Sequence, residues 1–111
     1  MHFTAAFPLW LAPEQVRVLT VSQKFDDYAK TVVQRLLDAG IRAGGDFDAE
    51  KIGAKIRKGR LDLVPYLCVV GAKEEENGTV ALRSRKEGEL GEMSVESLIE
   101  KLAEEVKMKV L

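Results

Sequence analysis

The feature that most constrains the fold is an unbroken apolar run at residues 66–71, YLCVVG. A half-exposed strand alternates apolar and polar residues, whereas a run that is apolar at every position is typical of a strand buried on both faces. Such a strand needs neighbouring strands on both sides and helices covering both faces. The run therefore predicts a central strand in a sheet that lies between two layers of helices.

Strands and helices alternate along the rest of the chain. β-branched residues predict a first strand at Val16–Val21, and apolar residues recur at helical spacing from Phe25 to Ala39. The other predicted elements are a strand at Ile41–Phe47, a helix at Ala49–Leu61, strands at Thr79–Arg83 and near Leu90–Met93, and a last helix that begins at Ser94 or Ser97. This order predicts an α/β fold with a parallel sheet and right-handed crossovers.

Local signals place the ends of these elements. Gly40 stands where the first helix needs a C-terminal cap, and Asp48 is placed to cap the helix that follows it. Gly44-Gly45 weakens the second strand and predicts an edge position or a bulge. Asn77-Gly78 predicts a turn before an alternating, antiparallel strand. Gly59, inside a helix, costs about 1 kcal/mol relative to alanine.

Length and composition bound the class of protein. The chain has 111 residues, 46% hydrophobic and 32% charged, which suits one globular domain with an apolar core. Cys68 is the only cysteine and lies in the apolar run, so we expect a packed thiol and no disulfide. His2 has no accompanying ligands for a metal, and no motif for catalysis or phosphate binding is present. No apolar stretch is long enough to predict a membrane span.

Positive charge gathers on the predicted helix before the central strand. Residues 51–60 carry five cations and no acid, although the net charge of the chain is −1. On a helical wheel Lys51, Lys55 and Lys58 lie on one flank of the apolar line, and Arg57 and Arg60 lie on the other. A local patch of this kind attracts polyanions, although from charge alone a solvated helix surface is the simpler interpretation.

Six motifs occur in one order along nearly the whole chain: FPLWLAPEQVRVL (7–19), GIRAGGD (40–46), EKIGAKIRKGRL (50–61), VPYLCVVGAKE (64–74), GTVALRSR (78–85) and LGEMS (90–94). Together they resemble the C-terminal anticodon-binding domain of bacterial-type threonyl-tRNA synthetases. Prolyl-, histidyl- and glycyl-tRNA synthetases carry related domains, but the third and fourth motifs are most similar to the threonyl branch. The resemblance implies a three-layer α/β/α fold with three main helices and a mixed five-stranded sheet that has one antiparallel strand.

The resemblance also implies a function. The domain would hold the anticodon loop of tRNA(Thr) so that the acceptor end reaches the catalytic domain of the same threonine–tRNA ligase. This chain would carry no catalytic residues and no cofactor, whereas the full-length enzyme would use ATP, Mg and Zn. We expect a cytoplasmic location, because a single cysteine suits a reducing compartment. We also expect a monomeric fragment, because the family's synthetases dimerise mainly through the catalytic domain.

The start of the chain bears on its origin. Met1 directly precedes His2, where the family motif would follow an upstream catalytic domain. We therefore interpret residues 1–111 as a single anticodon-binding domain excised from the C-terminus of a larger synthetase. A natural stand-alone paralogue ranks second. The alternative function is a stand-alone protein-interaction or regulatory domain on the same fold, because a fold does not fix a function.

The resemblance assigns roles to particular residues. Proteins recognise single-stranded loops with arginine planes, with carboxylates that accept base N–H groups and with lysines near phosphates. By motif position the implied anticodon contacts are Arg57, Glu74 and Arg83. The implied RNA-backbone contacts are Lys51, Lys55, Lys58 and Lys73. Open α/β sheets bind ligands beyond the carboxyl ends of their parallel strands, so we expect the anticodon at that edge.

Other interpretations apply to two of these residues when they are considered without the family. Glu74 is then one acid of a solvent-exposed acidic run, and Arg83 is then one partner of a salt bridge at a strand end. The chain also departs from the family motif D-x-RNEKIG, because Asp48 and Ala49 replace an arginine and an asparagine. Ala72 replaces the acid of the motif GDKE. By analogy with base readout in DNA, each lost contact weakens recognition by about 1–3 kcal/mol, so either the readout is modified or the partner differs.

Overall fold

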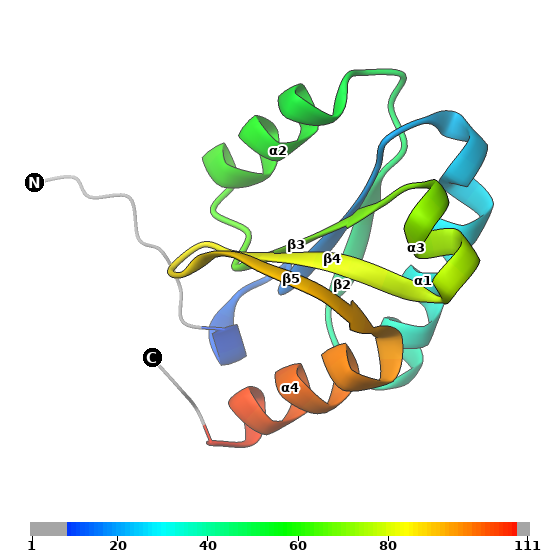
Figure 1. The fold of residues 1–111 in the computed structure, drawn as a ribbon. Coiled ribbons are helices and arrows are strands. Elements are labelled where there is room, and N and C mark those ends of the chain that lie inside the picture. Colours follow the sequence, from blue (N-terminus) through cyan, green and yellow to red (C-terminus); the bar gives the residue numbers. More distant parts are fainter. Residues whose placement is uncertain (1–8, 109–111) are drawn as a thin grey trace, which may run out of the picture.

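The computed structural model describes residues 9–108, which form a mixed five-stranded sheet with helices on both faces (Figure 1). The strands are β1 (Val16–Thr20), β2 (Ala43–Asp46), β3 (Tyr66–Val70), β4 (Thr79–Ser84) and β5 (Gly88–Ser94). They lie in the order β2-β1-β3-β4-β5, and β4 is the one antiparallel strand. The predicted central position of β3 and edge position of β2 are both confirmed.

Helices form the two outer layers. Helices α1 (Asp26–Asp38) and α4 (Val95–Met108) cover one face of the sheet, and α2 (Ile52–Leu61) covers part of the other (Figure 1). Short helical turns are η1 (Leu9–Leu11) and η2 (Gln23–Phe25). The order of elements and the layers confirm the α/β/α fold that the motifs implied.

Strands β1 and β3 contribute to two cores, because successive side chains point to opposite faces of a sheet. The larger core packs against α1 and α4, and its strand residues are Val16, Val18, Tyr66, Cys68, Val70, Val80 and Leu82. The smaller core packs against Ile52 and Ile56 of α2 and contains Leu19, Val64 and Leu67. The predicted packing of Cys68 is confirmed, and burial raises the pKa of its thiol.

Two predicted helix ends are confirmed. Gly40 follows α1 with a φ of 83°, the left-handed conformation that a glycine cap supplies without steric cost. Ser94 precedes α4, and its Oγ accepts a hydrogen bond of 3.1 Å from the Ser97 N–H.

The basic helix α2 begins later than predicted. Lys51 occupies the N-cap position of α2, and no side chain caps the helix. The Asp48 N–H donates to Asp46 Oδ1 at 3.1 Å, which forms a tight turn directly after β2 and delays the helix. The prediction that Asp48 caps α2 is therefore wrong, and its carboxylate lies 3.8 Å from Lys58 Nζ instead.

A short helix, α3 (Ala72–Asn77), follows β3 and was not predicted. Glu74 and Glu75 lie in its first turn, where negative charge suits the helix dipole. Gly78 ends it with a φ of 69°. The Asn77-Gly78 pair therefore ends a helix and leads into β4, rather than joining two strands of a hairpin.

Gly59 lets α2 approach β3 closely. A Cβ at this position would lie 2.6 Å from Leu67 Cδ2, which is too close for two carbon atoms. Glycine inside a helix costs about 1 kcal/mol, and at this position it allows α2 to contact the sheet closely.

Candidate nucleic-acid interface

Glu74 lies at the edge where the three parallel strands end. It occupies the first turn of α3, directly after β3. Its Oε1 accepts a hydrogen bond of 2.8 Å from the Gly71 N–H. Within residues 9–108 its Oε2 makes no hydrogen bond, so Glu74 is oriented through one oxygen and can accept a ligand's N–H with the other.

Arg83 lies farther along the sheet than predicted. It is opposite Leu67, the second residue of β3, and at about 3.3 Å per residue this is roughly 10 Å from the end of that strand. Its side chain is half-buried and its guanidinium lies 3.3 Å from Glu89 Oε2. Its Nε is buried and has no hydrogen-bond partner among residues 9–108. Glu74 and Arg83 therefore line an extended surface and do not meet at the carboxyl edge.

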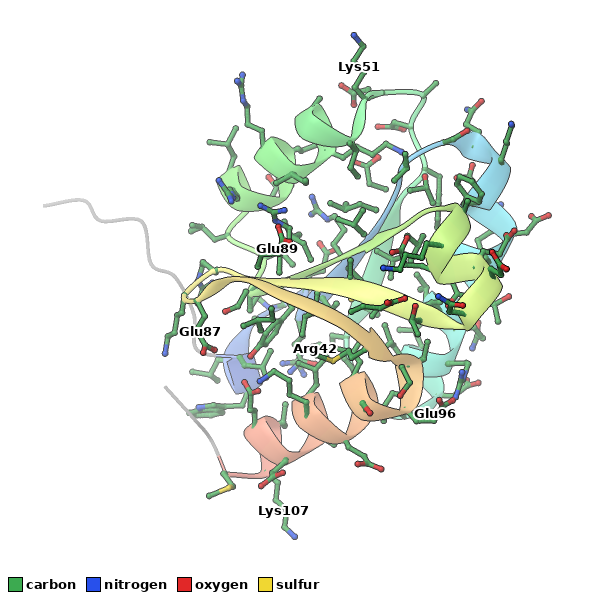
Figure 2. All side chains as sticks on the ribbon, in the orientation of Figure 1. Arg42, Lys51, Glu87, Glu89, Glu96 and Lys107 are labelled. Atoms are coloured by element: carbon green, nitrogen blue, oxygen red, sulfur yellow. The ribbon has the colours of Figure 1, made fainter. Side chains whose placement is uncertain are left out.

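Polar side chains of β4 and β5 connect these two positions. Because Val80 and Leu82 point into the larger core, the β4 residues on either side of them point away from it. Their cross-strand neighbours on β5 are Ser94 and two acids, Glu92 and Glu89. We call this surface the open face, and it consists of Thr79, Ala81, Arg83, Glu89 and Glu92. Figure 2 shows Glu89 near the turn between β4 and β5.

Lys73 of α3 reaches the open face. Its Nζ lies 3.5 Å from Glu92 Oε1, and its side chain is 71% exposed. The other carboxylate oxygen, Oε2, accepts from the Thr79 hydroxyl and from the Asn77 amide. The Thr79 hydrogen bond, followed by the Asn77 and Lys73 contacts, lowers the pKa of Glu92 below its usual range. Glu92 is therefore ionised at neutral pH.

Glu89 and Glu92 were not predicted as site residues from the sequence. Their charges were visible, but their partners lie on α3 and β4, and only the strand register brings them together. The expected strand near Leu90–Met93 is also longer than predicted, because β5 runs from Gly88 to Ser94. Cross-strand register is set by the whole sheet and is not readable from local spacing.

Three of the predicted cations on α2 are exposed. Lys51 projects into solvent at the start of the helix (Figure 2). Lys58 pairs with Asp48, and Arg57 forms no ion pair with any residue in the range 9–108. These positions allow contact with a polyanion, and the assignment of Lys51, Arg57 and Lys58 to RNA stays a prediction.

Lys55 is buried, and the prediction that it is an exposed phosphate contact is wrong. Its side chain is only 1% exposed, and its Nζ donates to Thr20 O and Thr20 Oγ1 at 3.0 Å each and to Asp46 O at 3.2 Å. The helical wheel explains the error, because Lys55 lies about 60° from Ile52, whereas Lys51 lies about 100° away. Lys55 therefore ties the carboxyl ends of β1 and β2 to α2.

A separate groove of about 660 Å³ runs beside the edge strand β2. Its lining includes Arg17, Gly44, Asp46 and Lys58. Arg17 is engaged in ion pairs with Glu14 and with Asp62. The groove contains neither Glu74 nor Arg83, so it does not coincide with the open face.

The described residues form neither a metal-binding cluster nor a helix that could span a membrane. Between residues 9 and 108 no three metal-binding side chains come together, and His2 lies outside this range. The described part of the chain also has no helix that is long and apolar enough to cross a membrane.

Comparison with known proteins gives a family and several relatives. A family model described as the anticodon binding domain matches residues 15–105. A threonine–tRNA ligase of Syntrophomonas wolfei is 54% identical over 110 residues, which is 99% of this chain and 17% of that protein. A threonine–tRNA ligase of Rhodopirellula baltica is 50% identical over 105 residues, covering 95% of this chain and 14% of that protein. This chain therefore spans less than a fifth of the length of either relative.

Solved structures give the same fold. The RNA binding domain of threonyl-tRNA synthetase from Cryptosporidium parvum superposes with a TM-score of 0.85 at 34% identity, covering 89% of this chain and 25% of that one. Histidyl-tRNA synthetase from Nostoc sp. superposes with a TM-score of 0.78 at 21% identity, covering 86% of this chain and 23% of that one. The second likeness supports the fold alone, whereas the first agrees with the resemblance that the six motifs carried.

Proposed function

Since the chain belongs to the anticodon binding domain family, we propose that it recognises the anticodon loop of tRNA(Thr) as one domain of a threonine–tRNA ligase. The identity of 54% to one threonine–tRNA ligase over almost the whole chain is the observation that carries the proposal. The domain binds and positions RNA, and the catalytic domain with its ATP and metal ions belongs to the remainder of the longer protein. That enzyme acts in the cytoplasm, where tRNA is charged.

The chemistry of the described surface supports this role. Glu74 offers a carboxylate oxygen to base N–H groups, and Arg83 offers a guanidinium plane on which a base can stack. Lys51, Arg57 and Lys73 are exposed cations that can neutralise phosphates. Helices α2 and α3 and strand β4 thus each carry charged side chains that can contact an RNA loop.

The test is a titration of the 111-residue chain with the anticodon stem-loop of tRNA(Thr). Binding should weaken steeply between low and physiological salt, because phosphate contacts release counterions. A stem-loop with altered anticodon bases should bind more weakly at every salt concentration. If no RNA binds even at low salt, the proposal is wrong, and the alternative of a protein-interaction domain on the same fold is favoured.

A further inference from the structure

Glu92 differs from the other acids of the open face in how it is held. The Thr79 hydroxyl and the Asn77 amide both donate to its Oε2, so two neighbours orient the carboxylate. Glu89, in contrast, is 71% exposed, and its one polar partner within residues 9–108 is Arg83. A carboxylate held by neighbouring donors loses little conformational freedom when it accepts a further hydrogen bond.

The other oxygen of Glu92 is weakly engaged. Within residues 9–108 the one polar partner of its Oε1 is Lys73 Nζ at 3.5 Å, which is longer than the 2.7–2.9 Å of a strong charge-assisted hydrogen bond. The Lys73 side chain is largely exposed, and exposed ion pairs of this kind contribute little stability. A ligand donor can therefore approach Oε1 while Lys73 moves to a phosphate.

Glu74 shows the same arrangement at the other end of α3. One of its oxygens is fixed by the Gly71 N–H and the other makes no hydrogen bond within residues 9–108, whereas the second oxygen of Glu92 has the long contact with Lys73. The two acids therefore form a pair of oriented carboxylates, one at the start of α3 and one beside its end. The family motifs pointed only to Glu74.

We propose that Glu92 is a specificity-determining residue that accepts an N–H from a nucleobase of the bound anticodon loop. The proposal rests on the proposed function and extends it to a second base-reading carboxylate. An ionised carboxylate can only accept, so a base that presents an amino or imino N–H is favoured there. A base that presents a carbonyl or ring nitrogen leaves the carboxylate desolvated and unpaired, and is rejected.

The test compares three variants of the 111-residue chain, each titrated at fixed salt with the threonine anticodon stem-loop and with one of altered anticodon bases. Glu92→Gln keeps the size of the side chain and removes its charge. Glu89→Gln makes the same change on the same strand and face. Glu100→Gln makes it on α4, on the opposite side of the sheet. Circular dichroism confirms that each variant is folded.

The measured quantity is the ratio of the affinity for the threonine stem-loop to the affinity for the altered stem-loop. Glu92→Gln should reduce this ratio by roughly tenfold, which corresponds to about 1.4 kcal/mol. Glu100→Gln should raise both affinities by a common factor, because it removes one negative charge that repels RNA. Glu89→Gln also releases Arg83 from its ion pair and should not lower the ratio. Thr79→Val keeps the Glu92 charge but removes the hydroxyl that orients it, so it should lower the ratio without a general rise in affinity.

Two outcomes would overturn the inference. In the first, Glu92→Gln changes both affinities equally, as Glu100→Gln does, and Glu92 is then only a surface charge. In the second, the unaltered chain binds RNA without discrimination, so that Glu92 selects nothing. In the first case the proposed function stands. In the second case RNA binding stands but recognition of the threonine anticodon does not, and a complete absence of RNA binding removes the proposed function itself.

Discussion

The two faces of the sheet are built from the same strands but packed in different ways. The face toward α1 and α4 is covered by a continuous apolar core that reaches from β1 to β4. The opposite face has a small core under α2, a buried amine at Lys55 and a polar open face on β4 and β5. The first face supplies stability, and the second leaves a surface on which a ligand can bind. Successive residues of β4 point alternately to the core face and to the open face.

Leu82→Ala should have the largest effect on stability. Leu82 is fully buried in the larger core, and truncation of a buried leucine typically costs 2–5 kcal/mol through lost burial and the cavity that remains. The measurement is urea unfolding followed by circular dichroism. Arg83→Ala, at the next position of β4 but on the open face, is the control and should cost less than about 1 kcal/mol. Equal losses for the two variants would mean that the open face is as important for stability as the core.

Lys55→Ala should have the second largest effect, about 2–3 kcal/mol. The change removes a buried aliphatic stem and the only side-chain donor that joins Thr20 and Asp46 to α2 within residues 9–108. The same unfolding measurement applies. Lys58→Ala is the matched control on the same helix, because Lys58 is exposed and 3.8 Å from its partner, and its loss should change stability by less than about 0.5 kcal/mol. Similar values for both lysines would contradict the buried role of Lys55.

The same contrast explains what the sequence could predict. The central strand, the edge strand and the burial of Val80 and Leu82 were predictable, because apolar periodicity reports directly on core faces. Lys55 was predicted to be exposed because lysine side chains usually are. Its burial instead depends on its position on the helix and on the carbonyl groups at the strand ends that accept hydrogen bonds from its amine. Glu92 was missed because its role depends on strand register and on a short helix with no apolar periodicity.

The open face should affect recognition more than stability. Glu74→Ala and Arg83→Ala should each lower the preference for the threonine anticodon stem-loop over one with altered bases by about 1–3 kcal/mol, because base contacts carry the discrimination. Lys51→Ala, which removes an exposed cation at the start of α2, should weaken both complexes equally. Paired titrations at fixed salt give the ratios. Unchanged ratios for both variants, with a parent chain that does discriminate, would show that the two residues do not read bases.

The smallest expected effects come from two glycines of α2, and they test how closely that helix must pack. Gly59→Ala should destabilise the domain by about 1 kcal/mol. The gain in helix propensity is smaller than the cost of a Cβ that meets Leu67 Cδ2 at 2.6 Å, even if the leucine side chain shifts. The measurement is again the free energy of unfolding in urea.

Gly53→Ala is the matched control. No atom lies within 4 Å of a Cβ at position 53, and its φ is outside the left-handed region, so the change should stabilise the domain by about 0.5 kcal/mol. Opposite signs at two glycines of one helix would mean that the close approach of α2 to β3 depends on Gly59 alone. If both changes stabilise, then α2 packs loosely enough to absorb an extra methyl group, and the small core is less rigid than the face covered by α1 and α4.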